Sequence, residues 1–174
     1  MIEKIYFDMD GVLVDFKRGI VELAGVDVNE SDEEMWIKVK NVDHFYYKLK
    51  PLDNQLEVFK RVNEKYNGIV EILTAIPKPK RNILDAKSDK IKWVLENIGV
   101  IPVNVVYSNE KCDYAKNKNY ILIDDSIRNI KEWEENGDTG IHYTNDVDII
   151  EKLETLDRRA PKRLAYNLKN NKTC

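Results

Sequence analysis

The sequence predicts an α/β protein with a doubly wound, Rossmann-like parallel sheet of about five strands and helices on both faces. Short apolar runs alternate with helical patterns along the chain, and a polar cluster follows almost every run. The expected strands cover residues 2–7, 69–73, 103–107, 120–123 and 140–143. In such a sheet the functional groups gather at the carboxyl ends of the strands, so the polar clusters are expected to meet at one edge.

Three helices are expected between these strands, because apolar residues recur there at helical spacing. Their apolar positions are Leu56, Phe59, Val62 and Tyr66 in the first helix, Ile91, Val94, Leu95 and Ile98 in the second, and Ile127, Ile130 and Trp133 in the third. The second helix is expected to stop at Gly99 and the third at Gly137, since glycine commonly ends a helix.

Residues 16–50 interrupt the alternation of strands and helices. They contain an apolar-periodic helix, then a capping box at Ser31 and Glu34 that opens a second helix, and then an aromatic cluster before Pro51. We therefore expect a core formed by 1–15 and 51–157, a small helical cap inserted at 16–50 over the strand ends, and a basic C-terminal tail at 158–174.

Composition restricts the class of protein. A net charge of −3, 43% hydrophobic and 34% charged residues indicate a globular chain and do not favour wholesale binding to nucleic acid or membrane. No run approaches the roughly 18–20 apolar residues of a membrane span, and no signal-peptide pattern opens the sequence. Cys112 and Cys174 suggest neither a disulfide framework nor a metal site, so a cytoplasmic location is expected. The basic tail favours a solvated end over nucleic-acid contact.

The segment Asp8–Asp15 carries the strongest chemical signal. A carboxylate at a strand end, with a second one two residues later, suits phosphoryl transfer: of Asp8 and Asp10, one acid can attack phosphorus while the other protonates the leaving oxygen. Both acids repel a phosphate, so a divalent cation is required. Gly11 permits the sharp turn that frees backbone N–H groups for the phosphate. A calcium loop is excluded, because its glycine and glutamate positions hold Leu13 and Gly19.

The run Asp8-Met-Asp-Gly-Val-Leu13 resembles the first motif of the haloacid dehalogenase-like superfamily. The other three motifs appear in the expected order at strand ends, at Thr74, Lys111 and Asp124-Asp125. The resemblance covers residues 3–145. It implies that Asp8 is the nucleophile and becomes an aspartyl phosphate, and that Asp10 protonates the leaving group and then activates water. It also implies that Thr74 binds the phosphate, that Lys111 balances its charge, and that Asp124 or Asp125 completes a Mg²⁺ site with Asp8 and the backbone carbonyl of Asp10.

The lysine of the third motif has a rival. Lys90 precedes a helical face, but an ordinary surface lysine is the favoured interpretation there, and Lys111 lies at the end of a strand. His44 and His142 are given no role.

A narrower resemblance, to the 5′(3′)-deoxyribonucleotidases, rests on Asp8–Phe16, on the inserted cap and on the run Leu73-Thr-Ala-Ile-Pro77. It implies hydrolysis of nucleoside monophosphates. By analogy the nucleobase is held by Trp36, Phe45 and Tyr46, although these aromatic residues are equally suited to packing the cap onto the core. Ala75 stands in the phosphate loop where a second hydroxyl is common in this group, which puts the fine phosphate contacts in doubt.

The alternatives are a phosphatase of nucleic-acid ends or of sugar phosphates, and a non-catalytic binding module on the same fold. The module is disfavoured because every residue that the chemistry requires is present.

Overall fold

The computed structural model describes residues 1–27, 29–144 and 147–159. Its centre is a parallel sheet of five strands in the order β3-β2-β1-β4-β5. The strands are β1 (Lys4–Phe7), β2 (Val70–Ala75), β3 (Val103–Val106), β4 (Tyr120–Asp124) and β5 (Thr139–His142). The expected fold class and all five expected strands are confirmed.

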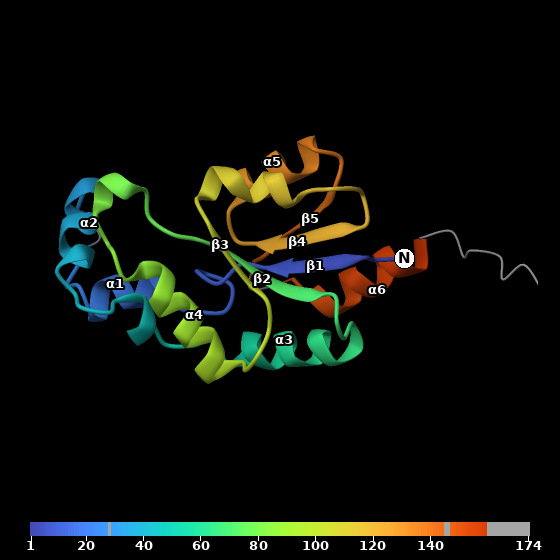
Figure 1. The fold of residues 1–174 in the computed structure, drawn as a ribbon, viewed down its shortest axis with the longest axis horizontal. Coiled ribbons are helices and arrows are strands. Elements are labelled where there is room, and N and C mark those ends of the chain that lie inside the picture. Colours follow the sequence, from blue (N-terminus) through green and yellow to red (C-terminus); the bar gives the residue numbers. More distant parts are fainter. Residues whose placement is uncertain (28, 145–146, 160–174) are drawn as a thin grey trace, which may run out of the picture.

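Helices cover both faces of this sheet (Figure 1). One face carries α3 (Asp53–Lys65), α4 (Ala86–Asn97) and α6 (Ile149–Arg159), and the other carries α5 (Ile127–Glu135) and the 3₁₀ segment η3 (Ser108–Tyr114). The three expected helices correspond to α3, α4 and α5, whereas α6 was not expected.

The two faces of the sheet explain why the strands read as continuous apolar runs. Alternate residues of β1 enter different cores: Phe7 packs on Phe59 of α3 with ring centroids 4.9 Å apart, and Tyr6 packs on Trp133 of α5 at 5.7 Å. A parallel sheet buried on both faces leaves no polar side to mark the alternation.

The register brings three strand ends to one level. Phe7 of β1 pairs with Ile72 of β2 and with Ile123 of β4. The amide of Asp8 then donates to the Ile123 carbonyl over 2.9 Å. After β1 the chain forms β2 and β3 on one side of β1, and it then forms β4 and β5 on the other side of β1. Asp8 therefore lies at the switch in strand order, where open α/β sheets bind ligands.

The expected cap segment, 16–50, forms α1 (Phe16–Glu22), α2 (Asp32–Lys40) and the 3₁₀ turn η1 (Tyr46–Lys48). These elements lie beyond the carboxyl ends of the strands, at the left of Figure 1. The expected capping box opens α2, because the side chains of Ser31 and Glu34 satisfy each other's backbone N–H groups.

Side-chain contacts hold the cap segment against the core. Arg81, in the 3₁₀ turn η2 (Pro79–Arg81) after β2, pairs with Asp32 over 3.1 Å and also with Glu33, both in the first turn of α2. The indole Nε1 of Trp93 donates to the carbonyl of Leu49 over 2.8 Å. Trp93 is 1% exposed, so its bond is shielded from water.

The buried face of α4 only partly matches the one that apolar spacing indicates. Val94 is buried as expected, but Ile91 and Leu95 are 41% and 56% exposed, while Lys90 is fully buried and Trp93 nearly so. The helix is rotated because Trp93 anchors it to the cap segment and Lys90 finds acidic partners at the strand ends. The interpretation of Lys90 as a surface lysine is wrong.

The described residues also bear on three smaller expectations, which concern the C-terminal tail, the cysteine Cys112 and membrane spans. The tail expected at 158–174 begins inside α6, which runs to Arg159, and its remainder at 160–174 lies outside the described residues. Cys112 is a free, half-buried thiol. Among the described residues, no helix has the length and apolar character needed to cross a membrane.

Candidate active site

Three of the expected acids converge at the adjoining ends of β1 and β4. Asp8 follows β1, Asp124 ends β4, and Asp125 follows it. Each offers a carboxylate oxygen, and the three oxygens lie within 4.8 Å of one another. Asp8 and Asp124 are buried, whereas Asp125 is exposed to solvent. The sequence brings these acids together because the parallel register aligns the two strand ends.

Lys111 lies between two of these acids. Its ammonium group is 2.9 Å from Asp8 Oδ1 and donates to Asp124 Oδ2 over 2.6 Å. The side chain comes from η3, which follows β3, and it is 1% exposed. Burial opposes its positive charge, but Asp8 and Asp124 outweigh burial and raise its pKa. Lys111 is therefore a fixed cation in the site.

Lys90 enters the same site from α4. Its Nζ donates to Asp10 Oδ2 over 2.7 Å and to Thr74 Oγ1 over 2.9 Å, and it lies 4.7 Å from the ring centroid of Tyr46. Thr74 is fully buried at the end of β2. Both lysines that the sequence offered as rivals thus face the acids, each with its own partners. Sequence reasoning favoured a surface position for Lys90 and therefore missed its place in this site.

The turn after Asp8 requires glycine at position 11. Gly11 has φ +76°, and a Cβ atom there would lie 2.2 Å from Asp125 Oδ2. The amides of residues 11–14 all bond inside the turn: Gly11 donates to the Val14 carbonyl, and the next three donate to the Met9 carbonyl. The expectation that this turn frees N–H groups for a phosphate therefore fails for residues 11–14, because the turn closes on itself.

The site is short of positive charge. Four carboxylates face two ammonium groups, so two positive charges are lacking when all the groups are ionised. Burial raises the pKa of Asp8 to about 7, with repulsion from Asp124 and Asp10 adding to the effect and Lys111 opposing it. Burial and the neighbouring Asp124 also raise the pKa of Asp125. A divalent cation bound by hard carboxylate oxygens would supply the missing charge, so the donor set fits Mg²⁺.

Asp124 and Asp125 differ in the donors that already surround them. Asp124 Oδ1 accepts from the Ser126 amide at 2.8 Å, and Oδ2 accepts from Lys111 and from Asn129 Nδ2, the latter at 3.0 Å. Asn129 in turn accepts from the hydroxyl of Ser108. Protein donors thus occupy both oxygens of Asp124. Sequence reasoning missed Asn129, the third residue of α5, because it belongs to none of the recognised motifs and is found only through its contact with Asp124.

The cap aromatics nominated for a nucleobase mostly pack inside the protein. Phe45 is fully buried and Tyr46 is 2% exposed. Their rings contact each other and Phe16 of α1 at centroid distances of 5.2 to 6.2 Å. Trp36 is half-buried, and the Arg81 guanidinium lies 5.8 Å from its ring centroid. The packing alternative fits Phe45 and Tyr46, and Trp36 retains exposed surface.

No protein-family profile matches the sequence, and no curated protein matches it either. A HAD (haloacid dehalogenase) family hydrolase from Deinococcus radiodurans R1, solved with bound phosphate and sodium, matches over 89% of this chain and 88% of its own, with a TM-score of 0.54 and 12% identity. The chain has the fold of a HAD family hydrolase. A HAD family enzyme from Bacteroides thetaiotaomicron, solved with magnesium and inorganic phosphate, matches over 87% and 99% of the two chains, with a TM-score of 0.48 and 16% identity.

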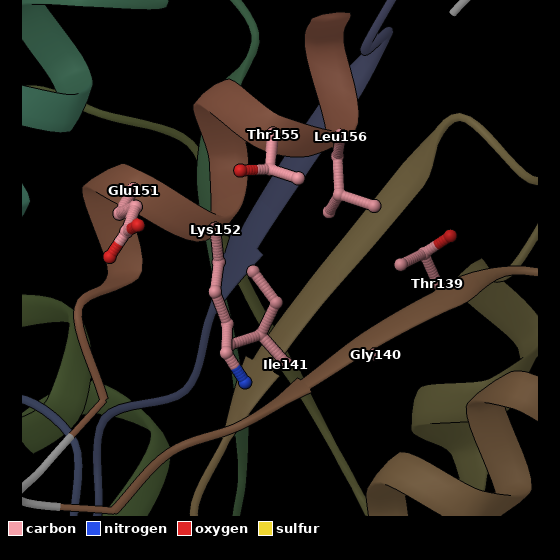
Figure 2. Close-up of a pocket in the computed structure, with 7 residues that line it drawn as sticks. All are labelled: Thr139, Gly140, Ile141, Glu151, Lys152, Thr155 and Leu156. Atoms are coloured by element: carbon pink, nitrogen blue, oxygen red, sulfur yellow. The ribbon is translucent and has the colours of Figure 1, made fainter. Parts of the chain in front are cut away.

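The HAD fold also has a hollow away from the acids. Its volume is about 420 Å³. Figure 2 shows that its lining side chains come from β5 and α6. Its lining consists of Thr139, Gly140, Ile141, Glu151, Lys152, Thr155 and Leu156. None of the sequence-predicted site residues lines it, and it brings no pair of acids together.

Proposed function

We propose that the protein is a magnesium-dependent phosphomonoesterase that uses Asp8 as a covalent nucleophile. One observation carries the proposal: Asp8 is a buried carboxylate at the switch in strand order, in a site that lacks two positive charges. A purely structural site would not collect four acids around two lysines, because like charges at this distance destabilise the fold. The lack of two positive charges is explained if a divalent cation binds in the site together with the phosphate of a substrate.

Mg²⁺ would be held by Asp8 and Asp125, with the backbone carbonyl of Asp10 as a third ligand. We assign Asp125 rather than Asp124 to direct contact because protein donors already occupy both oxygens of Asp124. Asp124 would then fix Lys111 and contribute charge. When bound, the ion supplies charge neutralisation for the phosphate oxygens and the attacking carboxylate.

The residues of the chain divide the chemistry between them. Asp8 forms a bond to phosphorus while the bond from phosphorus to the ester oxygen breaks, and Asp10 gives its proton to that oxygen. Water then attacks the aspartyl phosphate, its proton passes to Asp10, and the bond to Asp8 breaks to release inorganic phosphate. Lys90 holds Asp10 Oδ2, which leaves Oδ1 without a hydrogen-bond partner in the described part of the chain and available for proton transfer.

The phosphate would lie between the two lysines. Lys111 balances charge near Asp8, and Lys90 with the hydroxyl of Thr74 reaches the opposite side of the site. Gly11 keeps the turn close to Asp125, and the backbone of Ala75 borders the phosphate loop. Fixed cations of this kind stabilise the charge of the transition state without reorganisation.

The narrower substrate proposal is a deoxynucleoside or ribonucleoside monophosphate. It is supported by the resemblance of Asp8–Phe16 and of Leu73–Pro77 to the deoxyribonucleotidases, and by a helical segment beyond the strand ends. Trp36 is the nominated aromatic residue with surface left for stacking on a base. This assignment rests on the phosphatase proposal and is tested with it.

The test is release of inorganic phosphate, with Mg²⁺, from deoxynucleotides, ribonucleotides, sugar phosphates and an oligonucleotide with a terminal phosphate. Asp8→Asn keeps the shape of the nucleophile without its charge, and Asp113→Asn removes an exposed acid near Lys111 as the matched control. Mass spectrometry of acid-quenched enzyme locates the phosphoryl group.

We expect nucleotide turnover that chelator or Asp8→Asn abolishes and Asp113→Asn preserves, with phosphate trapped on Asp8. Turnover restricted to sugar phosphates or oligonucleotide ends would keep the mechanism and refute the nucleotidase assignment. Folded, magnesium-loaded protein that hydrolyses none of the esters would refute the phosphatase and favour a binding module.

A further inference from the structure

A second group of potential metal ligands lies where the cap segment meets α4. His44 Nδ1 is 2.8 Å from Asp89 Oδ1 and 3.6 Å from Asp85 Oδ2. One ligand atom from each of the three residues lies within 4.8 Å of the others. His44 belongs to the cap segment, while Asp85 precedes α4 and Asp89 lies in its first turns. None of the three contributes to the acidic site at Asp8.

The chain adopts unusual local geometry to form this group. His44 has φ +53°, a left-handed conformation that few non-glycine residues adopt. Its amide donates to Asp85 Oδ2 over 2.9 Å. Asp85 occupies the N-cap position of α4, yet its side chain makes no capping bond to the helix and turns to His44 instead. The backbone thus aims an imidazole and two carboxylates at one point.

The carboxylate of Asp89 points to a missing ligand. Asp89 is 3% exposed, its Oδ1 contacts His44, and its Oδ2 is buried without a hydrogen-bond partner among the residues that the structure describes. A buried, unpaired carboxylate oxygen is costly, whereas a metal ion would satisfy it. Among the described residues, Asp85 and Asp89 form no ion pair with a lysine or arginine, and both contact His44. With the imidazole neutral, as a metal ligand is, two negative charges remain for a divalent ion to neutralise.

The geometry and donor types suit a zinc-like ion. Ligands about 2.0–2.1 Å from a tetrahedral Zn²⁺ lie roughly 3.3 Å apart, and the two distances from His44 Nδ1 bracket that separation. Imidazole with carboxylates favours Zn²⁺ and related transition metals over Mg²⁺. The His44 side chain is 63% exposed, so water can complete the coordination. We propose that His44, Asp85 and Asp89 bind a divalent transition-metal ion that ties the cap segment to α4.

The test is a titration of the full chain with Zn²⁺, in excess Mg²⁺ to occupy the acidic site, followed by long-range ¹H–¹⁵N NMR of the imidazoles. The sequence has two histidines, so His44 and His142 can be assigned by a single substitution. We expect one equivalent of Zn²⁺ to shift the Nδ1 resonance of His44 and to leave that of His142 in place. This readout does not require phosphatase activity, so it distinguishes failure of the site from failure of the proposed function.

Affinity measured by calorimetry supplies the second arm. His44→Gln and Asp89→Asn should each weaken Zn²⁺ binding at least about tenfold, since each removes a ligand. Asp43→Asn, an exposed acid beside His44, is the matched control and should leave affinity unchanged. His44→Gln lies at an exposed position, so it keeps the test valid if Asp89→Asn does not fold.

Three results would overturn the proposal. One is Zn²⁺ binding that leaves the His44 Nδ1 resonance unmoved, and another is a shift confined to Nε2. The third is an affinity that survives His44→Gln but disappears in Cys112→Ser, which would assign the ion to the thiol.

Discussion

Asp8→Asn should stabilise the metal-free protein at neutral and alkaline pH while abolishing its activity. Burial raises the pKa of Asp8 from 3.8 to about 7, with Asp124 and Asp10 contributing. The folded state therefore binds this proton more tightly than the unfolded state, and it loses stability as the proton leaves. The loss begins as pH rises above about 4 and is complete above about 7. Asn carries no charge at any pH, so the variant avoids this loss of stability.

The expected magnitude follows from the shift in pKa. A difference of about three units corresponds to about 4 kcal/mol at 1.36 kcal/mol per unit. Near pH 4 both side chains are neutral, so the two proteins should unfold at similar urea concentrations. At pH 8 in chelator, the variant should be more stable by several kcal/mol, a large fraction of the roughly 5–15 kcal/mol that holds a typical domain folded.

Urea unfolding in chelator across this pH range measures the difference in unfolding free energy directly. Excess Mg²⁺ is the matched condition: it should stabilise the wild type and reduce the gap, because the variant lacks the ligand. A wild type as stable as Asp8→Asn at pH 8 without metal would refute the reasoning. So would a gap that does not change with pH, because a packing effect carries no proton linkage.

Three other substitutions test separate parts of the site. Lys90→Met should lower kcat/KM by about 10²–10³, because Asp10 and Thr74 lose the ammonium that orients them; a steady-state rate within threefold of wild type would contradict this role. Gly11→Ala should destabilise the fold by at least about 2 kcal/mol and weaken Mg²⁺ binding, because its Cβ would meet Asp125 Oδ2 at 2.2 Å. The control is Gly25→Ala, at φ +62° with open space around it, which should show only the cost of placing alanine in a left-handed conformation, about 1 kcal/mol in urea unfolding. Asn129→Ala should lower apparent Mg²⁺ affinity about 10–100-fold by releasing Asp124, as measured by activity against Mg²⁺ concentration, and unchanged affinity would remove Asn129 from the site.

The sheet and its acidic edge could be predicted because their signals are local. Each buried strand is a short apolar run, and each run ends at a polar residue whose position the parallel register then fixes. Asp8, Thr74 and Asp124 needed no knowledge of distant contacts to be placed at one edge. The capping box is likewise a local signal, since it spans the four residues from Ser31 to Glu34, and α2 begins where this motif predicts.

The cap aromatics show where local signals stop. The sequence around Phe45 and Tyr46 is the same whether their rings stack on a ligand or on Phe16 of α1, which lies about 30 residues earlier in the chain. Burial decides between these uses, and burial depends on how the segment folds back on itself. His44 is a similar case, since its acidic partners come from α4, 41 and 45 residues later.

Lys90 shows why the orientation of α4 could not be read from its own sequence. Apolar spacing selects a face that includes Ile91 and Leu95, and a lysine at the flank of that face is ordinarily exposed. A buried ammonium is tolerated only with an anionic partner, and that partner, Asp10, lies 80 residues away in the first turn of the chain. The rotation of the helix is thus set by a charge pair across the sheet edge. Because Asp89 precedes Lys90 directly, the rotation that brings Lys90 to Asp10 also buries Asp89 beside His44.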